Sequence, residues 1–599
     1  MTEPTWHKIL EPDQLDEGRV TTVSVGIRSF AVTRYQGEYG CLDNACPHQG
    51  GPLGEGSIEN GWLRCPWHGY DYSPTTGVPP EGFSDAPTCF ETDVRDDGVY
   101  VALPPEPAPE RTVSDVVVET LTNWGLTHVF GMVGHSNLGF ADAMRKAEER
   151  GDLTYIGIRH EGAAAFAASA FGKLTGRVAG CFGIAGPGST NLLTGLYDAK
   201  EDRAPVLALS GQVPSRVRGR GAFQDTDLEA AFADVAEFSE SMHADSDHAE
   251  LATLAMKTAI VGRNVAHLVF PDEVQHMPAG DDVPAGGPDG RTGSRAISPD
   301  PADLARAVSM LGSAKRPVIV VGHGARHQMS DVIALAERLG APVATTFKAK
   351  GLIADDHPLG CGVMGRSGTP VASGFMNESD LLVVFGASFS NHTGLASYKP
   401  TIQVDDDPMS LGRFHAVDVP LQGNVAVTAR LLREGLPADL AATDARAEVL
   451  ERRSIWLAEK ARRQSDDAGH GIGAAAVMAA LSTHVDDDAV IAVDVGNNTY
   501  SFGRYFEVSG GQDVLMSGYL GSIGFSFPAA MGAWAAVGES RPVVSVSGDG
   551  GFGQYAMEVT TAVKYGMNIT HVLLNNGELG KISKEQRAAN WEVWQTSLH

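Results

Sequence analysis

Two cysteines and two histidines stand in a pair of short loops near the start of the chain. The first loop reads Cys46-Pro-His48 and the second Cys65-Pro-Trp-His68, with 16 residues between His48 and Cys65. Thiolates and imidazoles of this kind can hold a two-iron, two-sulfur cluster, the cysteines on one iron and the histidines on the other. A Cys₂His₂ zinc site is the alternative, but zinc fingers favour two closely spaced cysteines followed by a histidine pair. The pattern therefore favours an iron–sulfur centre.

The segments that follow these loops closely resemble those of Rieske proteins. They read Gln49-Gly-Gly-Pro-Leu53 and Gly69-Tyr-Asp-Tyr72. In the respiratory-complex branch of that family each loop carries one more cysteine, whereas this chain has Gly51 and Trp67 there. The resemblance thus implies the ferredoxin or oxygenase branch, whose cluster has a lower potential. The cluster ligands that it implies are Cys46, His48, Cys65 and His68.

A second group of polar residues follows two apolar runs near the end of the chain. Gly548-Asp-Gly550 comes after Val543–Val546, and Asn575-Asn576 ends the next run. Glycines let a backbone approach a diphosphate closely, and the oxygens of Asp549 and Asn576 suit Mg²⁺. A tight turn and an unrelated asparagine pair would be the interpretation of each motif alone. Two neighbouring strands would instead bring both motifs to one magnesium diphosphate site.

The chain from Val113 to His599 resembles thiamine diphosphate enzymes of the pyruvate oxidase and acetolactate synthase group. The resemblance rests on the Gly-Asp-Gly motif and on four further segments. These segments are Arg159-His-Glu161-Gly-Ala-Ala-Ala-Phe-Ala-Ala, Gly186-Pro-Gly188 with Asn191, Asp494-Val-Gly-Asn-Asn498 and Gly521-Ser-Ile-Gly524.

This resemblance implies roles for individual residues. Glu161 would hydrogen-bond N1′ of the cofactor's aminopyrimidine, and Ile523 would wedge under the thiamine and hold it bent. The magnesium shell would be Asp549, Asn576 and the main-chain carbonyl of Glu578. The other cofactor-binding residues that the resemblance implies are Gly186, Asn191, Gly496, Asn497, Gly548 and Gly550.

Glu161 precedes the apolar run Ala163–Ala168, where an acidic side chain could simply cap a helix. The other thiamine motifs favour a catalytic role instead. The chemistry needs a carboxyl group in an apolar pocket to move a proton on the pyrimidine ring. We therefore predict that Glu161 is essential for turnover.

The same resemblance implies a substrate pocket. Phe223 and Gln224 end a Gly219–Gln224 segment similar to the Phe-Gln segment that lines this pocket in pyruvate oxidases and acetolactate synthases. A plain core position is the alternative for Phe223. His135 stands where the family has a substrate-side loop, but a lone loop histidine is more often a solvated side chain. We expect Phe223 and Gln224, and not His135, to act on the substrate.

The middle of the chain resembles the FAD-carrying domain of pyruvate oxidases. Glycines after strands suit the diphosphate of a dinucleotide. The chain lacks a clean Gly-x-Gly-x-x-Gly, and family members without flavin keep a similar fold, so a central domain without FAD is the alternative. The FAD-binding residues that the resemblance implies are Gly322, Gly324, Gly365 and Asp405.

The composition is that of a globular protein, with 599 residues of which 43% are hydrophobic and 20% charged. The net charge of −28 disfavours nucleic acid and anionic membranes, because both bind Lys/Arg-rich surfaces. The start of the chain has no secretion signal, and no apolar stretch approaches the roughly 18 residues of a membrane span. Six cysteines without a disulfide spacing pattern fit reduced thiols. We expect a cytoplasmic protein.

A small all-β domain and three α/β domains with parallel sheets are needed to position these sites. Pro-rich and polar linkers are expected at 103–110 and 464–473, and Ser114 is expected to cap the first helix. Strands are predicted at Pro317–Val321, Leu381–Phe385, Val490–Val493 and Ile569–Leu574. The predicted domains are a Rieske domain at 1–103, a pyrimidine-binding domain at 112–276, a central FAD or nucleotide-type domain at 298–436 and a diphosphate-binding domain at 470–599.

A one-electron cluster fused to a thiamine enzyme favours a redox reaction. We expect oxidative decarboxylation of a pyruvate-like 2-oxo acid, with electrons passing through FAD and the cluster to a quinone or ferredoxin. A non-redox decarboxylase or carboligase like acetolactate synthase, with an accessory Rieske domain, is the alternative. A non-catalytic electron-transfer protein is disfavoured by the presence of Glu161, Asp549 and Asn576. The resemblance also implies a homodimer or homotetramer with the thiamine site between subunits, and a truncated C-terminal domain.

Overall fold

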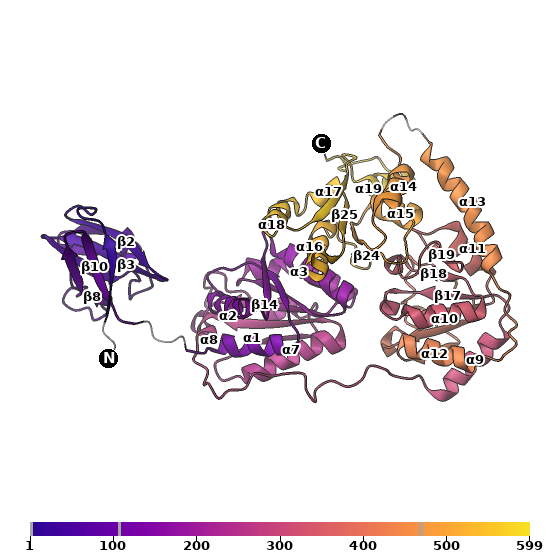
Figure 1. The fold of residues 1–599 in the computed structure, drawn as a ribbon, viewed down its shortest axis with the longest axis horizontal. Coiled ribbons are helices and arrows are strands. Elements are labelled where there is room, and N and C mark those ends of the chain that lie inside the picture. The colour runs from indigo at the N-terminus through magenta and orange to yellow at the C-terminus, as the bar shows by residue number, and fades with distance from the viewer. Residues whose placement is uncertain (1–3, 106–109, 467–468, 470, 599) are drawn as a thin grey trace. The chain divides into compact units, whose positions relative to one another are not determined.

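The computed structural model describes residues 4–105, 110–466, 469 and 471–598. The chain divides into two compact units, Met1–Glu110 and Arg111–His599. The first unit is built from antiparallel strands and the second alternates helices with parallel strands (Figure 1), which confirms the predicted fold class. The linkers expected at 103–110 and 464–473 lie partly outside the described residues.

The first unit is an all-β domain. Its strands are β1 (Thr5–Leu10), β2 (Arg19–Val25), β3 (Arg28–Tyr35), β4 (Glu38–Asp43), β5 (Ser57–Glu59), β6 (Trp62–Arg64), β7 (Asp71–Tyr72), β8 (Cys89–Phe90), β9 (Thr92–Arg95) and β10 (Gly98–Leu103). They form three sheets with the orders β2-β3-β4-β8, β1-β10-β9 and β5-β6-β7. Because side chains alternate along a strand, Phe30 and Val32 of β3 enter one core while Ala31 packs with Leu42, Leu63 and both cluster cysteines in another.

The second unit begins with an N-terminal α/β domain. Its elements are α1 (Val113–Asn123), β11 (His128–Gly131), α2 (Leu138–Glu149), β12 (Thr154–Gly157), α3 (Glu161–Thr175), β13 (Ala179–Gly183), α4 (Pro187–Asn191), α5 (Leu193–Glu201), β14 (Val206–Gln212), α6 (Leu228–Phe232), β15 (Phe238–Ser241), α7 (His248–Gly262), β16 (Val265–Pro271) and α8 (Asp272–Gln275). The strands form one parallel sheet with the order β12-β11-β13-β14-β16-β15.

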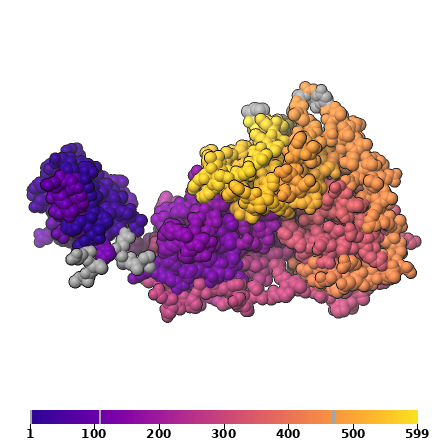
Figure 2. Space-filling model, in the orientation of Figure 1, coloured from indigo at the N-terminus to yellow at the C-terminus, as the bar shows by residue number. Residues whose placement is uncertain are grey.

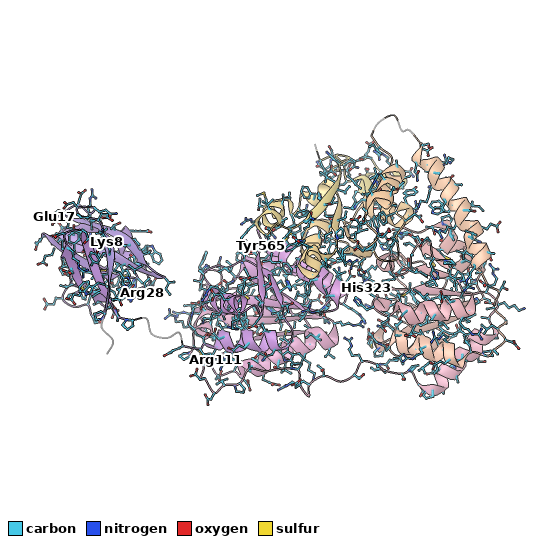
Figure 3. All side chains as sticks on the ribbon, viewed as in Figure 1. Lys8, Glu17, Arg28, Arg111, His323 and Tyr565 are labelled. Atoms are coloured by element: carbon cyan, nitrogen blue, oxygen red, sulfur yellow. The ribbon has the colours of Figure 1, made fainter. Side chains whose placement is uncertain are left out.

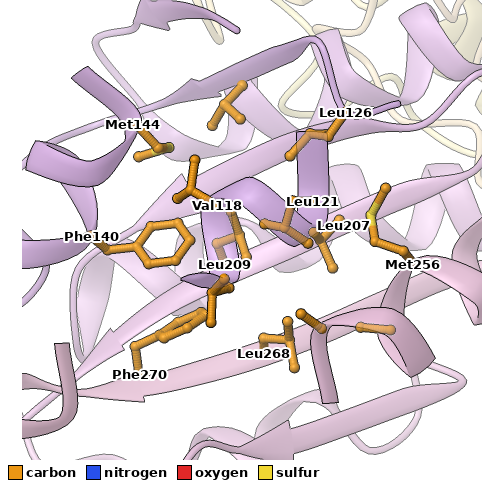
Figure 4. Close-up of a cluster of buried hydrophobic side chains, with 14 of the residues drawn as sticks. Val118, Leu121, Leu126, Phe140, Met144, Leu207, Leu209, Met256, Leu268 and Phe270 are labelled. Atoms are coloured by element: carbon orange, nitrogen blue, oxygen red, sulfur yellow. The ribbon is translucent and has the colours of Figure 1, made fainter. Parts of the chain in front are cut away.

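Helices cover both faces of this sheet, so its strands are apolar on both sides. Leu207 and Leu209 of β14 pack with Val118 and Leu121 of α1 on one face (Figure 4). The intervening residues of β14 pack on the other face, against α3. Burial on both faces explains why such strands have continuous rather than alternating apolar sequences.

The first helix begins earlier than predicted. Its N-cap is Thr112, whose hydroxyl accepts from the Asp115 N–H at 3.3 Å while the Asp115 carboxylate accepts from the Thr112 N–H at 2.8 Å. Ser114 lies inside the helix and donates to the Gln275 carbonyl at 3.0 Å instead, so its predicted capping role was wrong. The reciprocal pair satisfies two backbone donors, which a lone Ser114 cap would not.

The central domain has the second parallel sheet. Its elements are α9 (Pro301–Ser313), β17 (Pro317–Val321), α10 (Met329–Leu339), β18 (Val343–Thr345), β19 (Gly360–Val363), α11 (Pro370–Glu378), β20 (Leu381–Phe385), β21 (Thr401–Asp405), β22 (Val419–Gln422) and α12 (Val425–Gly435), and the long helix α13 (Arg446–Gln464) follows. The strand order is β19-β18-β17-β20-β21-β22. From β17 the successive strands β18 and β19 are added on one side, and the later strands β20, β21 and β22 are added on the other. The strand order therefore reverses between β17 and β20. Open α/β sheets bind ligands at the carboxyl ends of the strands that flank such a topological switch point.

The C-terminal domain has the third parallel sheet. Its elements are α14 (Ala474–His484), β23 (Val490–Val493), α15 (Asn497–Tyr505), β24 (Asp513–Met516), α16 (Ser526–Val537), β25 (Val543–Gly548), α17 (Asp549–Phe552), α18 (Val559–Lys564), β26 (Ile569–Leu574) and α19 (Gly580–Ala588). The strand order β24-β23-β25-β26 gives a second switch point, between β23 and β25. The four strands predicted at Pro317, Leu381, Val490 and Ile569 are confirmed with their bounds.

Helices α3 and α16 join the N-terminal and C-terminal domains of the second unit. They lie side by side between the two domains (Figure 1), and every residue of α3 except Thr175 is buried. A Cβ on Gly532 of α16 would lie well under 3.0 Å from the Ala167 carbonyl oxygen of α3. The C-terminal domain, yellow in Figure 2, also contacts the central domain. No described helix is apolar and long enough to cross a membrane.

Candidate functional site

The two Cys–His loops of the first unit share one backbone geometry. Cys46 follows β4 and Cys65 follows β6. In each loop the cysteine N–H donates to a carbonyl five residues on, and the cysteine carbonyl accepts from a glycine N–H four residues on. These bonds are Cys46 to Gly51 at 2.9 Å, Gly50 to Cys46 at 2.7 Å, Cys65 to Tyr70 at 2.8 Å and Gly69 to Cys65 at 3.1 Å. Two equivalent loops thus present one thiol and one imidazole each.

The four predicted ligands converge. Both cysteine side chains are buried, and the rings of His48 and His68 are 4.7 Å apart between centroids. Nδ1 of His48 is buried without a partner, as expected of an atom that ligates a metal. Burial raises the pKa of the Cys65 thiol, so a bound metal is needed to hold it as a thiolate. These donors fit a two-iron cluster with two protein ligands on each iron.

No three His, Cys, Asp or Glu side chains of the described residues are grouped to hold a single ion.

Gly51, Tyr70 and Tyr72 lie against the predicted cluster ligands. A Cβ on Gly51 would lie 2.7 Å from the Cys65 Sγ, so a side chain there would intrude on the cluster ligands. The Tyr72 hydroxyl lies 3.1 Å from the Cys46 Sγ, and Tyr70 stacks on His48 with 4.2 Å between ring centroids. In the sequence Tyr72 is only part of the segment that resembles Rieske proteins. Its contact with the predicted iron ligand Cys46 was not predicted. Trp67 is exposed.

In the second unit Glu161 is the first residue of α3, in a pocket lined by the Gly186–Asn191 segment. The Asn191 side chain donates to Glu161 Oε2 at 3.0 Å, and a Cβ on Gly188 would lie 3.1 Å from Glu161 Oε1. The helix cap is His160, whose Nδ1 accepts from the Gly162 N–H at 3.0 Å. Glu161 is only 6% exposed, so its carboxyl group is largely shielded from bulk water.

The predicted substrate residues adjoin this pocket. A Cβ on Gly186 would lie 3.1 Å from the Gln224 Cβ, and the Gln224 Oε1 is buried without a partner. Gln224 also has a φ of 61°, an unusual conformation for a residue other than glycine. Phe223 is 78% exposed with its ring 6.2 Å from that of His135, so the core alternative for Phe223 was wrong.

The Gly-Asp-Gly motif and Asn576 lie at one edge of the third sheet. Gly548 of β25 pairs with Leu574 of β26, so the residues after each strand are neighbours. The Gly577 N–H, next to Asn576, donates to Asp549 Oδ2 at 2.7 Å. The Glu578 carbonyl accepts from the Gly580 N–H at 2.8 Å and keeps a second lone pair. The three predicted magnesium ligands are thus brought together.

The loops that follow β23 and β24 lie at the same edge of the third sheet as the Gly-Asp-Gly motif. Gly496 has a φ of 135°, and the Asn497 Oδ1 accepts from Lys584 at 3.1 Å. Ile523 is partly exposed between Gly521 and Gly524, both at positive φ. Asp494 was singled out in the sequence only as the first residue of the Asp494–Asn498 motif. In the structure it is 1% exposed, and this burial is the main reason why its pKa is raised to about 6.

A cavity of about 290 Å³ opens at the switch point of the central sheet. Gly322 and Gly324 after β17, Gly386 after β20 and Asp405 at the end of β21 line it, with His323, which Figure 3 labels. Its size lies near the lower end of the range of about 300–1,000 Å³ for small-molecule sites. Gly365 does not line it, although its neighbours Met364 and Arg366 do. The Gly322 and Gly386 backbones pack so closely that a side chain on Gly322 would meet the Gly386 carbonyl.

The second and third sheets share this cavity, because loops of the C-terminal domain form part of its wall. Those residues are Val495, Gly496, Thr499, Tyr500, Ser517, Gly518, Tyr519 and Gly521. Asp202 of the N-terminal domain also lines it and pairs with Lys173 at 2.8 Å and Lys348 at 2.6 Å. Burial opposes ionisation of Asp202, but these two cations hold its pKa below the ordinary value. Three domains therefore meet at this cavity.

Comparison with known families gives four matches along the chain. Residues 5–82 match the Rieske [2Fe-2S] domain. Residues 111–231, 304–432 and 494–597 match the N-terminal TPP-binding, central and C-terminal TPP-binding domains of thiamine pyrophosphate enzymes. These matches confirm both resemblances inferred from the sequence.

Curated relatives align with most of the chain. A thiamine pyrophosphate-containing protein of Bacillus subtilis is 36% identical over 80% of this chain and 82% of its own. The acetolactate synthase large subunit of Corynebacterium glutamicum is 32% identical over 80% and 77%. The pyruvate oxidase of Lactiplantibacillus plantarum is 30% identical over 79% and 78%.

Proposed function

Because the chain belongs to the thiamine pyrophosphate enzymes and carries an N-terminal Rieske [2Fe-2S] domain, we propose that it oxidatively decarboxylates a pyruvate-like 2-oxo acid. With pyruvate and water the products would be acetate, CO₂, two protons and two electrons. The electrons would leave through a flavin and, one at a time, through the Rieske cluster, either to one quinone, which takes both electrons and the two protons, or to two ferredoxins, which take one electron each.

One observation carries the redox part of this proposal: the cavity at the central switch point shares walls with the thiamine-type edge of the third sheet. Gly496 and Gly521, from two thiamine-motif loops, line the same cavity as Gly322 and Asp405. A dinucleotide held by the central domain would therefore lie next to the thiamine loops. That proximity is what two-electron transfer from a thiamine-bound substrate to a flavin requires.

The chain's own residues would act on the substrate and cofactors as follows. Thiamine diphosphate, when bound, supplies the carbanion chemistry that lets a 2-oxo acid lose CO₂. Glu161 would hold and move a proton at the pyrimidine, and Asn191 keeps its carboxylate oriented. Asp549, Asn576 and the Glu578 carbonyl would hold Mg²⁺ against the diphosphate. Gln224, whose Oε1 lacks a partner, would bind the substrate.

A non-redox carboligase is the second candidate, favoured by the acetolactate synthases among the relatives. In that reaction two 2-oxo acids would join with loss of one CO₂, so no electrons would leave the site. A flavin and cluster would then stay oxidised during turnover.

Anaerobic titration of the cofactor-loaded protein with pyruvate tests the proposal. Flavin and Rieske absorbance are followed together with CO₂ release. We expect both chromophores to bleach in step with CO₂, and the Glu161→Gln variant to bleach neither. CO₂ release with both spectra unchanged would contradict oxidative decarboxylation and support carboligation.

We also propose a homodimer or homotetramer. Met557, Val563, Trp591 and Trp594 of the C-terminal domain are each at least 67% exposed, and a partner subunit would remove such apolar side chains from water. Sedimentation analysis of the native protein tests this, and a monomer at micromolar concentration would contradict it.

A further inference from the structure

Asp494 is a buried carboxylate surrounded by hydrogen-bond donors. Its Oδ1 accepts from the Val495 N–H at 2.7 Å and the Gly524 N–H at 2.9 Å. Its Oδ2 accepts from the Ser526 hydroxyl at 3.1 Å and the Ser526 N–H at 3.4 Å. Gly524 directly follows Ile523, so Asp494 fixes the backbone that presents the predicted thiamine wedge.

The same carboxylate touches the Gly-Asp-Gly segment. A Cβ on Gly551 would lie 2.8 Å from Asp494 Oδ2, so the start of α17 packs directly on this side chain. The Asp494 carbonyl also accepts from the side chains of Asn498 at 2.8 Å and Thr499. Asp494 thus ties together the three loops that follow β23, β24 and β25.

The segment from Ser517 to Ser526 is held at its other end by the central domain. Tyr519 hydrogen-bonds the Ser388 hydroxyl, and the Lys348 ammonium lies 4.5 Å from the centre of the Tyr519 ring. Ser517, Gly518, Tyr519 and Gly521 line the central cavity, whereas the Gly524 N–H, next to Ile523, donates to Asp494. One segment of ten residues therefore borders both candidate cofactor sites.

We propose that Asp494 is a positioning residue that fixes the 517–526 segment, so that thiamine diphosphate binding at Ile523 also orders the wall of the central cavity. The proposal rests on the thiamine site of the proposed function. A carboxylate is suited to this task because it only accepts hydrogen bonds, and all of the groups named above that face it are donors. An asparagine would turn its NH₂ group toward one of those donors and leave it unpaired.

The test compares wild-type protein with Asp494→Asn and with Ser526→Ala, which removes only the hydroxyl bond. Hydrogen exchange is measured on peptic fragments covering 517–526, and thiamine diphosphate binding with Mg²⁺ is measured by tryptophan fluorescence. Asp494→Asn should speed exchange in these fragments and weaken binding about tenfold, because a buried donor loses its acceptor. Ser526→Ala should weaken binding less than about threefold.

A merely structural role would speed exchange in the core strands β23 and β25 as well, so their unchanged exchange is part of the expected result. In wild-type protein, adding thiamine diphosphate and Mg²⁺ should slow exchange at both ends of 517–526. Slowing at neither end, or only beside Ile523, would overturn the proposal even if Asp494→Asn failed to fold. Equal binding by wild type and Asp494→Asn would also overturn it. No binding by wild type would instead contradict the proposed function.

Discussion

The iron–sulfur site and the thiamine site of this chain are assembled in opposite ways. The four cluster ligands lie between positions 46 and 68 of one small β domain, on two equivalent hairpin loops. The predicted thiamine residues run from Glu161 to Glu578 and lie on two parallel sheets whose domains are joined by the packing of α3 on α16. A site made of adjacent loops depends on local turns, whereas a distributed site depends on domain packing. We therefore expect that a substitution can inactivate either site and leave the other intact.

Cys65→Ser should have the largest effect on the local site. The serine hydroxyl is far less acidic than a thiol and is a poor ligand for iron, so most of the cluster absorbance should be lost. The thiamine unit is separate, and CO₂ release with an artificial electron acceptor should stay within about twofold of wild type. Visible spectra and a CO₂ assay measure both. Loss of CO₂ release in this variant would show that the two sites are not independent.

Glu161→Gln is the matching change in the distributed site. Loss of a positioned proton-transfer group should lower kcat by about 10²–10⁴-fold. The amide can still contact Asn191, so the fold and the cluster spectrum should be unchanged. Steady-state kinetics and circular dichroism provide the measurements. Activity within tenfold of wild type would remove Glu161 from its assigned role.

Gly532→Ala probes the domain packing itself. The added Cβ would meet the Ala167 carbonyl, and overpacking of this kind costs about 1–3 kcal/mol. Calorimetry should show a lower Tm for the second unit only, with the Rieske transition unmoved. Gly538→Ala is a sterically open control, since nothing lies within 4 Å of a Cβ there, although its positive φ adds some strain.

Tyr72→Phe should give the smallest change. The hydroxyl beside the Cys46 sulfur can donate a hydrogen bond that stabilises the reduced, more negative cluster. Its removal should lower the potential by roughly 40–90 mV, corresponding to about 1–2 kcal/mol for one electron. Redox titration followed by absorbance measures the shift. An unchanged potential would mean that the Tyr72 hydroxyl makes no bond to the thiolate.

The sequence predicted features that depend on neighbouring residues better than features that depend on packing. Strands such as Pro317–Val321 were predicted with their bounds because continuous apolar β-branched runs are typical of sheets buried on both faces. The Thr112 cap is an exception, because the spacing of Thr112 and Asp115 is itself a local signal for a helix start that the prediction of Ser114 overlooked. The exposure of Phe223 was left open because only tertiary structure decides it.

The candidate sites show the same difference between features that depend on neighbouring residues and features that depend on domain packing. The Cys–His loops and the Gly-Asp-Gly motif could be located from residue types alone. The shared wall of the central cavity could not, because it brings Gly322 next to Gly496 and Gly521 through domain packing. The role assigned to Glu161 is a prediction that Glu161→Gln tests, and the roles assigned to Ile523 and the magnesium ligands remain predictions.

The burial of α3 by α16 has a consequence for biosynthesis. Glu161 and Ser526 are 526 − 161 = 365 positions apart, so α3 leaves the ribosome long before the helix that covers it. At about 5–20 residues per second the delay is roughly 20–70 s. During that time the alanine-rich face of α3 is open to solvent and to other nascent chains. Packing of α3 on α16 is thus a late event in the synthesis of the second unit, and chaperone capture of α3 would raise the yield of folded protein.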